Sequence, residues 1–170
     1  MNIETRSFNI RTANPSSAND VNVLIITGTA VTFNQKTFIG GNYCFDEIIL
    51  PGALDHTDLS DVKFLISHQR TMIPVARYRK DNPSTMSFSI DRTGLHITAR
   101  LDPDNRTSVE LYSAIKRGDI SGMSFAFTVD DDDWPDIGAD VPLRRIKSIA
   151  RIDDVSACAY PAYNGTTLSI

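Results

Sequence analysis

The sequence predicts a mainly β protein with flanking helices (class α+β), built as an antiparallel β barrel or as two packed sheets. Short segments rich in β-branched and aromatic residues recur along the chain, and turns containing Gly or Pro separate them at intervals of about ten residues. Few segments have helical periodicity. Many short strands with few helices favour an antiparallel sheet over a parallel one.

Length and composition indicate one ordinary globular domain. The chain has 170 residues, of which 41% are hydrophobic and 22% charged, enough for a real core and against wholesale disorder. We expect residues 1–20 to be a polar leader, flexible or forming a short strand followed by a loop, and residues 21–170 to form a single domain.

Charge and hydropathy make several classes of partner unfavourable. The net charge of -4 gives no basic excess for nucleic acid, and no apolar run approaches membrane-spanning length. We therefore expect no nucleic-acid or membrane partner, and we find no secretory signal. Cys44 and Cys158 lie far apart in strand-like segments, so buried free thiols in a reducing cytosol are the expectation.

Strands are expected before and after one clear helix. Their expected ranges are 21–31, 43–50, 62–68, 72–78, 86–90, 95–101, 123–129, 144–149 and 153–160. The helix is expected over 107–117, opening with a capping box from Thr107 to Glu110 and ending at Gly118. Six aspartates between residues 130 and 140 predict a solvated loop.

The strand that follows the helix has one face of small side chains. From residue 123 to 129, large apolar residues alternate with Ser124, Ala126 and Thr128. Small side chains leave room for another backbone to lie close, so Ser124 is a candidate nucleophile beside a bound peptide. The alternative is a closely packed strand on which Ser124 is only a surface hydroxyl.

Three residue types together supply what acyl transfer needs. Ser124 begins one strand, His68 ends another, and an acid stands at Asp153 or Asp154. An imidazole can take the hydroxyl proton and return it to the leaving amine, while a carboxylate holds the imidazole tautomer. Each also has a structural explanation: His68 as a hydrogen-bonded surface residue, and the two aspartates as turn caps.

Other chemistries have weaker support. Arg144 and Arg145 are candidate donors to an oxyanion, although ion pairs with the aspartate segment are the alternative. Cys158 lies in an apolar segment that is typical of a core. The three histidines show no metal-ligand spacing, so we expect neither a metal nor another cofactor.

Six segments in order resemble the prohead (capsid maturation) serine proteases of tailed bacteriophages. The serine segment 118–127 is close to the family's G-x-I-x-G-M-S-F-G-F, and 47–54 is similar to its E-x-I-x-P-G-A-F. The remaining segments are 28–34, 64–68 followed by 74–77, 94–97, and 154–156 followed by 160–163. The resemblance spans roughly residues 28–168.

The resemblance implies a fold like that of the herpesvirus assemblin proteases, a β barrel flanked by helices. It implies His68 as general base, Ser124 as nucleophile and Asp154 as third member, where the family usually has Glu. Asp154 is shorter than Glu by one methylene, about 1.5 Å, and Asp153 is the neighbour that could substitute. In assemblins a pair of arginines stabilises the oxyanion, which adds weight to Arg144 and Arg145.

The function that the resemblance implies is a serine endopeptidase of capsid maturation. It would cleave the major capsid protein and scaffold segment inside the assembling prohead, in the cytoplasm of the bacterial host, and would also cleave itself. A homo-oligomer, a dimer or larger, is expected. The alternative is a catalytically impaired scaffold or capsid-binding module on the same fold.

Overall fold

A computed structural model describes residues 2–9, 23–41, 43–159 and 168–169, and it confirms that the protein is mainly β. The described elements are one helix and eleven strands. In chain order they are β1 Glu4–Asn9, β2 Leu24–Thr32, β3 Thr37–Ile39, β4 Phe45–Ile49, β5 Asp61–Ile66, β6 Ala76–Arg79, β7 Met86–Asp91, β8 Gly94–Leu101, α1 Arg106–Arg117, β9 Gly122–Asp133, β10 Leu143–Cys158 and β11 Leu168–Ser169.

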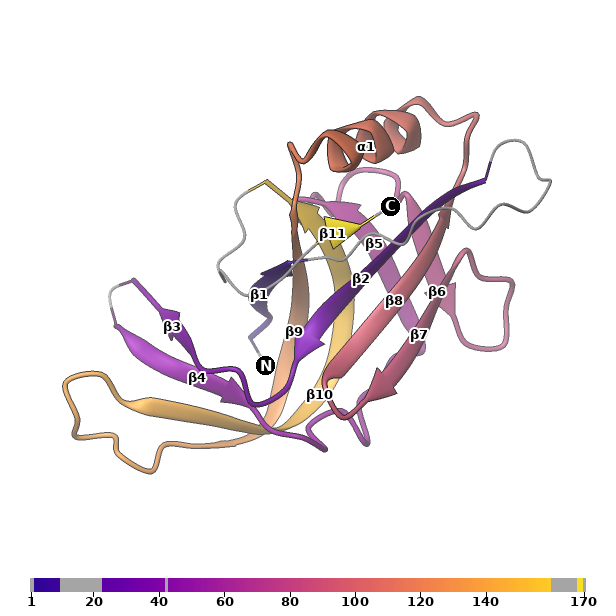
Figure 1. The fold of residues 1–170 in the computed structure, drawn as a ribbon. Coiled ribbons are helices and arrows are strands. Elements are labelled where there is room, and N and C mark those ends of the chain that lie inside the picture. Colours follow the sequence, from indigo (N-terminus) through magenta and orange to yellow (C-terminus); the bar gives the residue numbers. More distant parts are fainter. Residues whose placement is uncertain (1, 10–22, 42, 160–167, 170) are drawn as a thin grey trace.

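The strands form two sheets that face each other. The larger follows the order β1-β9-β10-β4-β3, with β5 and β6 attached to β10, and the smaller follows β11-β2-β8-β7. Figure 1 shows the larger sheet curling as a half-barrel, with α1 over one end. The pairing is mainly antiparallel as predicted, with two exceptions, because β10 runs parallel to β4 and β5. The described residues hold one helix, where flanking helices were expected.

Residues 2–9 belong to the expected polar leader, and in the structure they contain β1. The short-strand alternative therefore describes them, because β1 pairs antiparallel with β9 (Figure 1). Residues 10–20 of the leader lie outside the described residues, as does segment 160–163 of the resemblance.

Strands β9 and β10 form one long hairpin in the larger sheet. The predicted aspartate loop starts too early, because β9 continues to Asp133 and only Asp136 and Asp140 lie in the exposed turn that follows. The two strands expected at 144–149 and 153–160 are a single irregular strand. Opposite charges face each other across the hairpin, which removes the repulsion among the aspartates. The ion pairs are Asp131–Lys147 at 2.8 Å, Asp132–Arg144 at 2.6 Å and Asp133–Arg145 at 2.7 Å.

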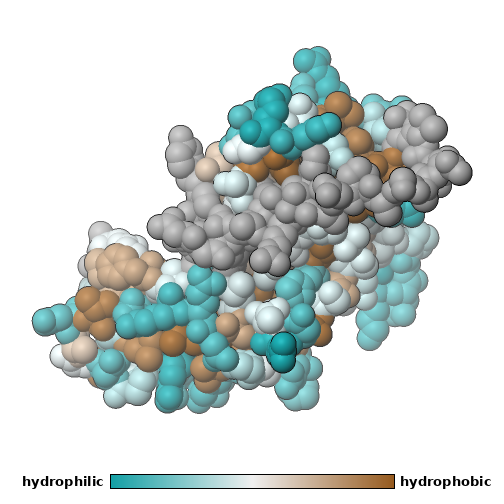
Figure 2. Space-filling model, viewed as in Figure 1, coloured by the Kyte–Doolittle hydropathy of each residue, from teal (hydrophilic) through white to brown (hydrophobic). Residues whose placement is uncertain are grey.

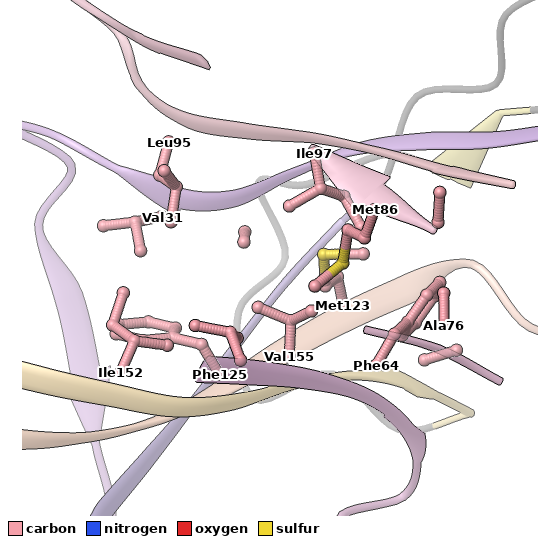
Figure 3. Close-up of a cluster of buried hydrophobic side chains, with 14 of the residues drawn as sticks. Val31, Phe64, Ala76, Met86, Leu95, Ile97, Met123, Phe125, Ile152 and Val155 are labelled. Carbon is pink, nitrogen blue, oxygen red and sulfur yellow. The ribbon is translucent and has the colours of Figure 1, made fainter. Parts of the chain in front are cut away.

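The core lies between the two sheets. Phe125 and Met123 from β9 point toward Leu95 and Ile97 of β8 (Figure 3), and all four are at most 2% exposed. The alternation predicted for β9 is therefore confirmed for its large residues. Its small face is buried as well, because Ser124 is 0% exposed, and the surface-hydroxyl alternative is wrong.

Helix α1 delivers the chain to the start of β9. It ends at Gly118 as predicted, with φ at 80°, a conformation that glycine adopts without a Cβ clash. Its start differs from the predicted capping box: the side chain of Asn105 accepts a hydrogen bond from the backbone N–H of Ser108 at 3.3 Å. Asparagine is among the strongest N-caps, so the helix begins one residue earlier than expected.

The surface mixes hydrophilic and hydrophobic residues, and Figure 2 shows several hydrophobic ones over the region of β3 and β4. Phe38 and Tyr43 there are 56% and 87% exposed. Cys158 is buried as expected, whereas Cys44 is exposed, and both thiols are free. No helix in the described part of the chain is both long and apolar enough to cross a membrane.

Candidate active site

His68 lies in a tight turn just after β5. The predicted strand was two residues too long, because Ser67 and His68 both have positive φ, 50° and 55°. The amide of Gln69 donates to the carbonyl of Ile66 at 3.1 Å and closes the turn. Left-handed backbone at a residue other than Gly costs on the order of 1 kcal/mol or more. The turn persists because β10 holds it: the Ser67 amide donates to Ala157 O at 3.0 Å.

The turn directs the imidazole of His68 between a hydroxyl and a carboxylate. Its Nε2 lies 2.6 Å from Ser124 Oγ, and its Nδ1 lies 2.6 Å from Asp154 Oδ1. When Nδ1 carries the proton donated to the carboxylate, Nε2 is free to accept the hydroxyl proton. The structure thus brings together the three residues selected from the sequence, in the order that acyl transfer requires.

Asp154, not Asp153, is the acid beside the histidine. Asp154 has a side chain only 2% exposed. Asp153 pairs with Arg151 instead, whose Nε donates to it at 2.8 Å. The missing methylene of Asp relative to Glu leaves no gap here, because Asp154 Oδ1 lies 2.6 Å from His68 Nδ1.

Two supporting residues, Ser156 and Arg70, were missed. Ser156 Oγ accepts from the His68 amide at 3.1 Å and donates to Asp154 Oδ1 at 3.0 Å, so it links the turn to the acid. Arg70 Nη2 donates to Asp154 Oδ2 at 3.4 Å. Ser156 stands two residues after Asp154, on the same face of a strand, and that spacing was a usable signal. No sequence pattern indicated that Arg70 would contact the acid.

The edge of β9 beside Ser124 is covered by β1. The register pairs Ser7 with Ser124 and Arg6 with Phe125, and Ser124 Oγ donates to the carbonyl oxygen of Arg6 at 2.7 Å. A carbonyl bond is about 1.23 Å long, so the carbonyl carbon lies within about 3.9 Å of Oγ. The hydroxyl has one proton and two acceptors. When His68 takes the proton, the oxygen is left facing a peptide carbonyl.

Arg144 and Arg145 lie ten and nine residues before Asp154 on β10, and their contacts are with acids. Arg144 pairs with Asp132, Glu4 and Glu47, and Arg145 pairs with Asp133. The pairs with Asp132 and Asp133 are the ion pairs that the sequence offered as the alternative, whereas those with Glu4 and Glu47 were not anticipated. Their role at an oxyanion stays a prediction.

Glu4 and Arg144 are joined by two hydrogen bonds, at 2.5 and 2.8 Å. Burial alone would raise the pKa of the Glu4 carboxyl. Hydrogen bonding and the charges of Arg144 and Arg6 outweigh burial, and the pKa is lower than its usual value. Glu4 is therefore ionised at neutral pH and binds Arg144 as a carboxylate.

Comparison with known proteins identifies the family. The sequence model of the Caudovirus prohead serine proteases matches residues 8–170. The "Prohead protease" of Enterobacteria phage HK97 is 30% identical over 142 residues, which are 81% of this chain and 56% of that relative. The chain therefore spans little more than half the length of that relative. No solved structure matches. From its match to the family over nearly its whole length, the chain belongs to the Caudovirus prohead serine proteases.

Proposed function

We propose that this chain is a serine endopeptidase that cleaves capsid and scaffold proteins inside the assembling prohead. In this proposal Ser124 is the nucleophile, His68 the general base and Asp154 its orienting carboxylate. The observation that carries the proposal is the hydrogen-bonded series from Ser124 Oγ through His68 to Asp154, with both contacts at 2.6 Å. Family membership supports the capsid-maturation role.

Catalysis begins when Ser124 Oγ attacks the peptide carbonyl carbon and His68 Nε2 takes the hydroxyl proton. The carbonyl π electrons move to oxygen, giving a tetrahedral oxyanion. When the C–N bond breaks, His68 returns the proton to the leaving amine and an ester remains on Ser124. Water, deprotonated by the same imidazole, then hydrolyses the ester. Asp154 stabilises the imidazolium at both stages.

A peptide substrate binds along the edge of β9 as an added strand. The register of β1 supports this mode, because β1 lies antiparallel to β9 and presents a carbonyl to Ser124. The same contact supports self-cleavage at the Arg6–Ser7 bond. Removal of residues 1–6 would free the part of this edge from Phe125 to Phe127, including the place of Arg6, for other substrates.

An impaired binding module was the alternative because the side chain of Asp154 is shorter than that of the Glu usual in the family. The 2.6 Å contact between Asp154 Oδ1 and His68 Nδ1 favours the enzyme instead. The expected homo-oligomer and the location in the host cytoplasm stay predictions. Light scattering on the purified chain measures the first of these.

Co-expression with the major capsid protein of the same phage tests the proposal. We expect the capsid protein to be shortened by the wild-type chain and by Ser121→Ala, an exposed serine three residues from the nucleophile. Ser124→Ala should leave the capsid protein intact. Equal processing by Ser124→Ala and wild type would refute the assignment of the nucleophile.

A further inference from the structure

We propose that this site selects a basic side chain, preferably arginine, at the residue before the cleaved bond, and that Glu47 is the residue that selects it. The inference rests on the proposed function, because it takes Arg6 of β1 as the stand-in for that substrate residue. Arg6 is the residue whose carbonyl oxygen lies 2.7 Å from Ser124 Oγ.

The side chain of Arg6 occupies a pocket that fits a guanidinium group. Its Nε and Nη2 donate to the two carboxylate oxygens of Glu47 at 2.5 and 2.7 Å, a bidentate geometry that lysine cannot reproduce. The guanidinium carbon also lies 5.5 Å from the ring centroid of Phe127, within range of a cation–π contact. We call Glu47, Phe127 and Arg144 the arginine pocket.

The charged groups of the arginine pocket are shielded from water, so the pocket discriminates between substrate side chains by their charge. Glu47 is 1% exposed and Arg6 8%. A carboxylate buried in this way is unfavourable unless cations pair with it. Arg144 pairs with Glu47 at 3.2 Å but is shared with Asp132, whereas an arginine at this position donates to both Glu47 oxygens. A neutral or acidic side chain here would remove those two bonds.

The charged contacts of β1 show how a substrate strand would match the pocket. Arg144 joins Glu47 and Asp132. From β1, Arg6 pairs with Glu47 and Glu4 pairs with Arg144. The second contact indicates that an acidic side chain two residues before the basic one also fits.

The test uses diphenyl phosphonates, which react with a serine nucleophile and carry one side chain beside the phosphorus. Probes with arginine-like, alanine-like and glutamate-like side chains are compared on the full-length Arg6→Ala chain, in which the pocket has lost its resident side chain. The readout is the ratio of labelling rates, arginine-like to alanine-like, so a general loss of reactivity does not imitate a loss of selectivity.

We expect a ratio of roughly 10 to 100, the range for a buried charge-assisted interaction. Adding Glu47→Gln should bring the ratio to about 1–3, because the isosteric amide removes the charge. Adding Glu110→Gln, the same change at an exposed site on α1, should leave the ratio as it was. Ser124→Ala should abolish labelling by every probe.

Four results would count against the inference. Labelling that depends on Ser124 but shows no basic preference, or a preference that survives Glu47→Gln, overturns the inference and leaves the proposed function standing. No Ser124-dependent labelling by any probe overturns the proposed function and the inference with it. If Glu47→Gln does not fold, benzamidine replaces it: this arginine mimic should slow labelling by the alanine-like probe more than neutral benzamide does, and equal effects overturn the inference.

Discussion

Replacing Asp154 by asparagine tests how the acid acts, because the structure predicts which way the amide will turn. Both carboxylate oxygens accept hydrogen bonds: Oδ1 lies near His68 Nδ1 and Ser156 Oγ, and Oδ2 near Arg70 Nη2. Asparagine has one acceptor oxygen and one NH₂ group, which only donates. The guanidinium cannot accept a hydrogen bond, so we expect the amide oxygen to face Arg70.

The amide N–H₂ then faces Nδ1 of His68 and forces Nδ1 to be the acceptor. The ring proton moves to Nε2, where the imidazole can no longer take the proton of Ser124. A carboxylate-to-amide change at this position of a Ser-His-Asp triad lowers the rate by about 10⁴-fold, about 5 kcal/mol of transition-state stabilisation. Asp154 is 2% exposed at the side chain, so water does not bridge the mismatch.

The assay is the second-order rate of labelling by a fluorophosphonate, which needs the nucleophile but no peptide pocket. We expect Asp154→Asn to slow labelling by 10³- to 10⁴-fold. Adding Arg70→Ala removes the group that fixes the amide, so the amide can turn over and part of the rate should return. A rate for Asp154→Asn within threefold of wild type would refute the role of the acid, and the absence of any rescue would refute the tautomer argument.

Three further outcomes are expected. Ser156→Ala should slow the same labelling about tenfold, because the histidine amide and the triad carboxylate lose a shared partner; an unchanged rate would contradict this. Gly94→Ala should lower the melting temperature by about 5–10 °C, since its φ is 152° and a Cβ would lie 1.8 Å from a backbone oxygen of β2, whereas Gly138→Ala, with open space around it, should change it little. Burial raises the pKa of the Cys158 thiol to about 11, so at mildly alkaline pH its reactive thiolate is scarce. Iodoacetamide should then modify exposed Cys44 first, and equal rates at the two thiols, measured by mass spectrometry, would be evidence against this.

Local patterns predicted the parts of the site that depend on local order. The alternation from Met123 to Val129 predicted a strand with one large and one small face, and Gly118 marked the helix end that places it. Both signals depend on neighbouring residues only. The motif order then selected His68 and Ser124 as partners, and the structure places them in contact.

Long-range pairing accounts for what local patterns missed. The aspartates after Val129 form a strand because basic residues lie opposite them on β10, and a count of like charges does not include that partner strand. The turn at Ser67 and His68 uses positive φ at two residues with side chains, stabilised by hydrogen bonds to β10. Intrinsic preference argues against such a turn, and only the tertiary contact favours it.

The N-terminal strand is the largest such difference. A polar stretch such as Glu4–Asn9 carries no strand signal strong enough to specify a partner. Its place beside β9 depends on Arg6 and Glu4 meeting Glu47 and Arg144, which lie 41 and 140 residues away in the chain. Composition and periodicity do not predict ion pairs between residues that lie far apart in the chain.

Mapping a fluorophosphonate adduct by peptide mass spectrometry tests the central claim most directly. The claim is that His68 activates Ser124 as the nucleophile. The account predicts one adduct, on Ser124, that is lost in Ser124→Ala and strongly reduced in His68→Ala, and that persists in Ser121→Ala. An adduct on another serine, or equal labelling of wild type and His68→Ala, would contradict it.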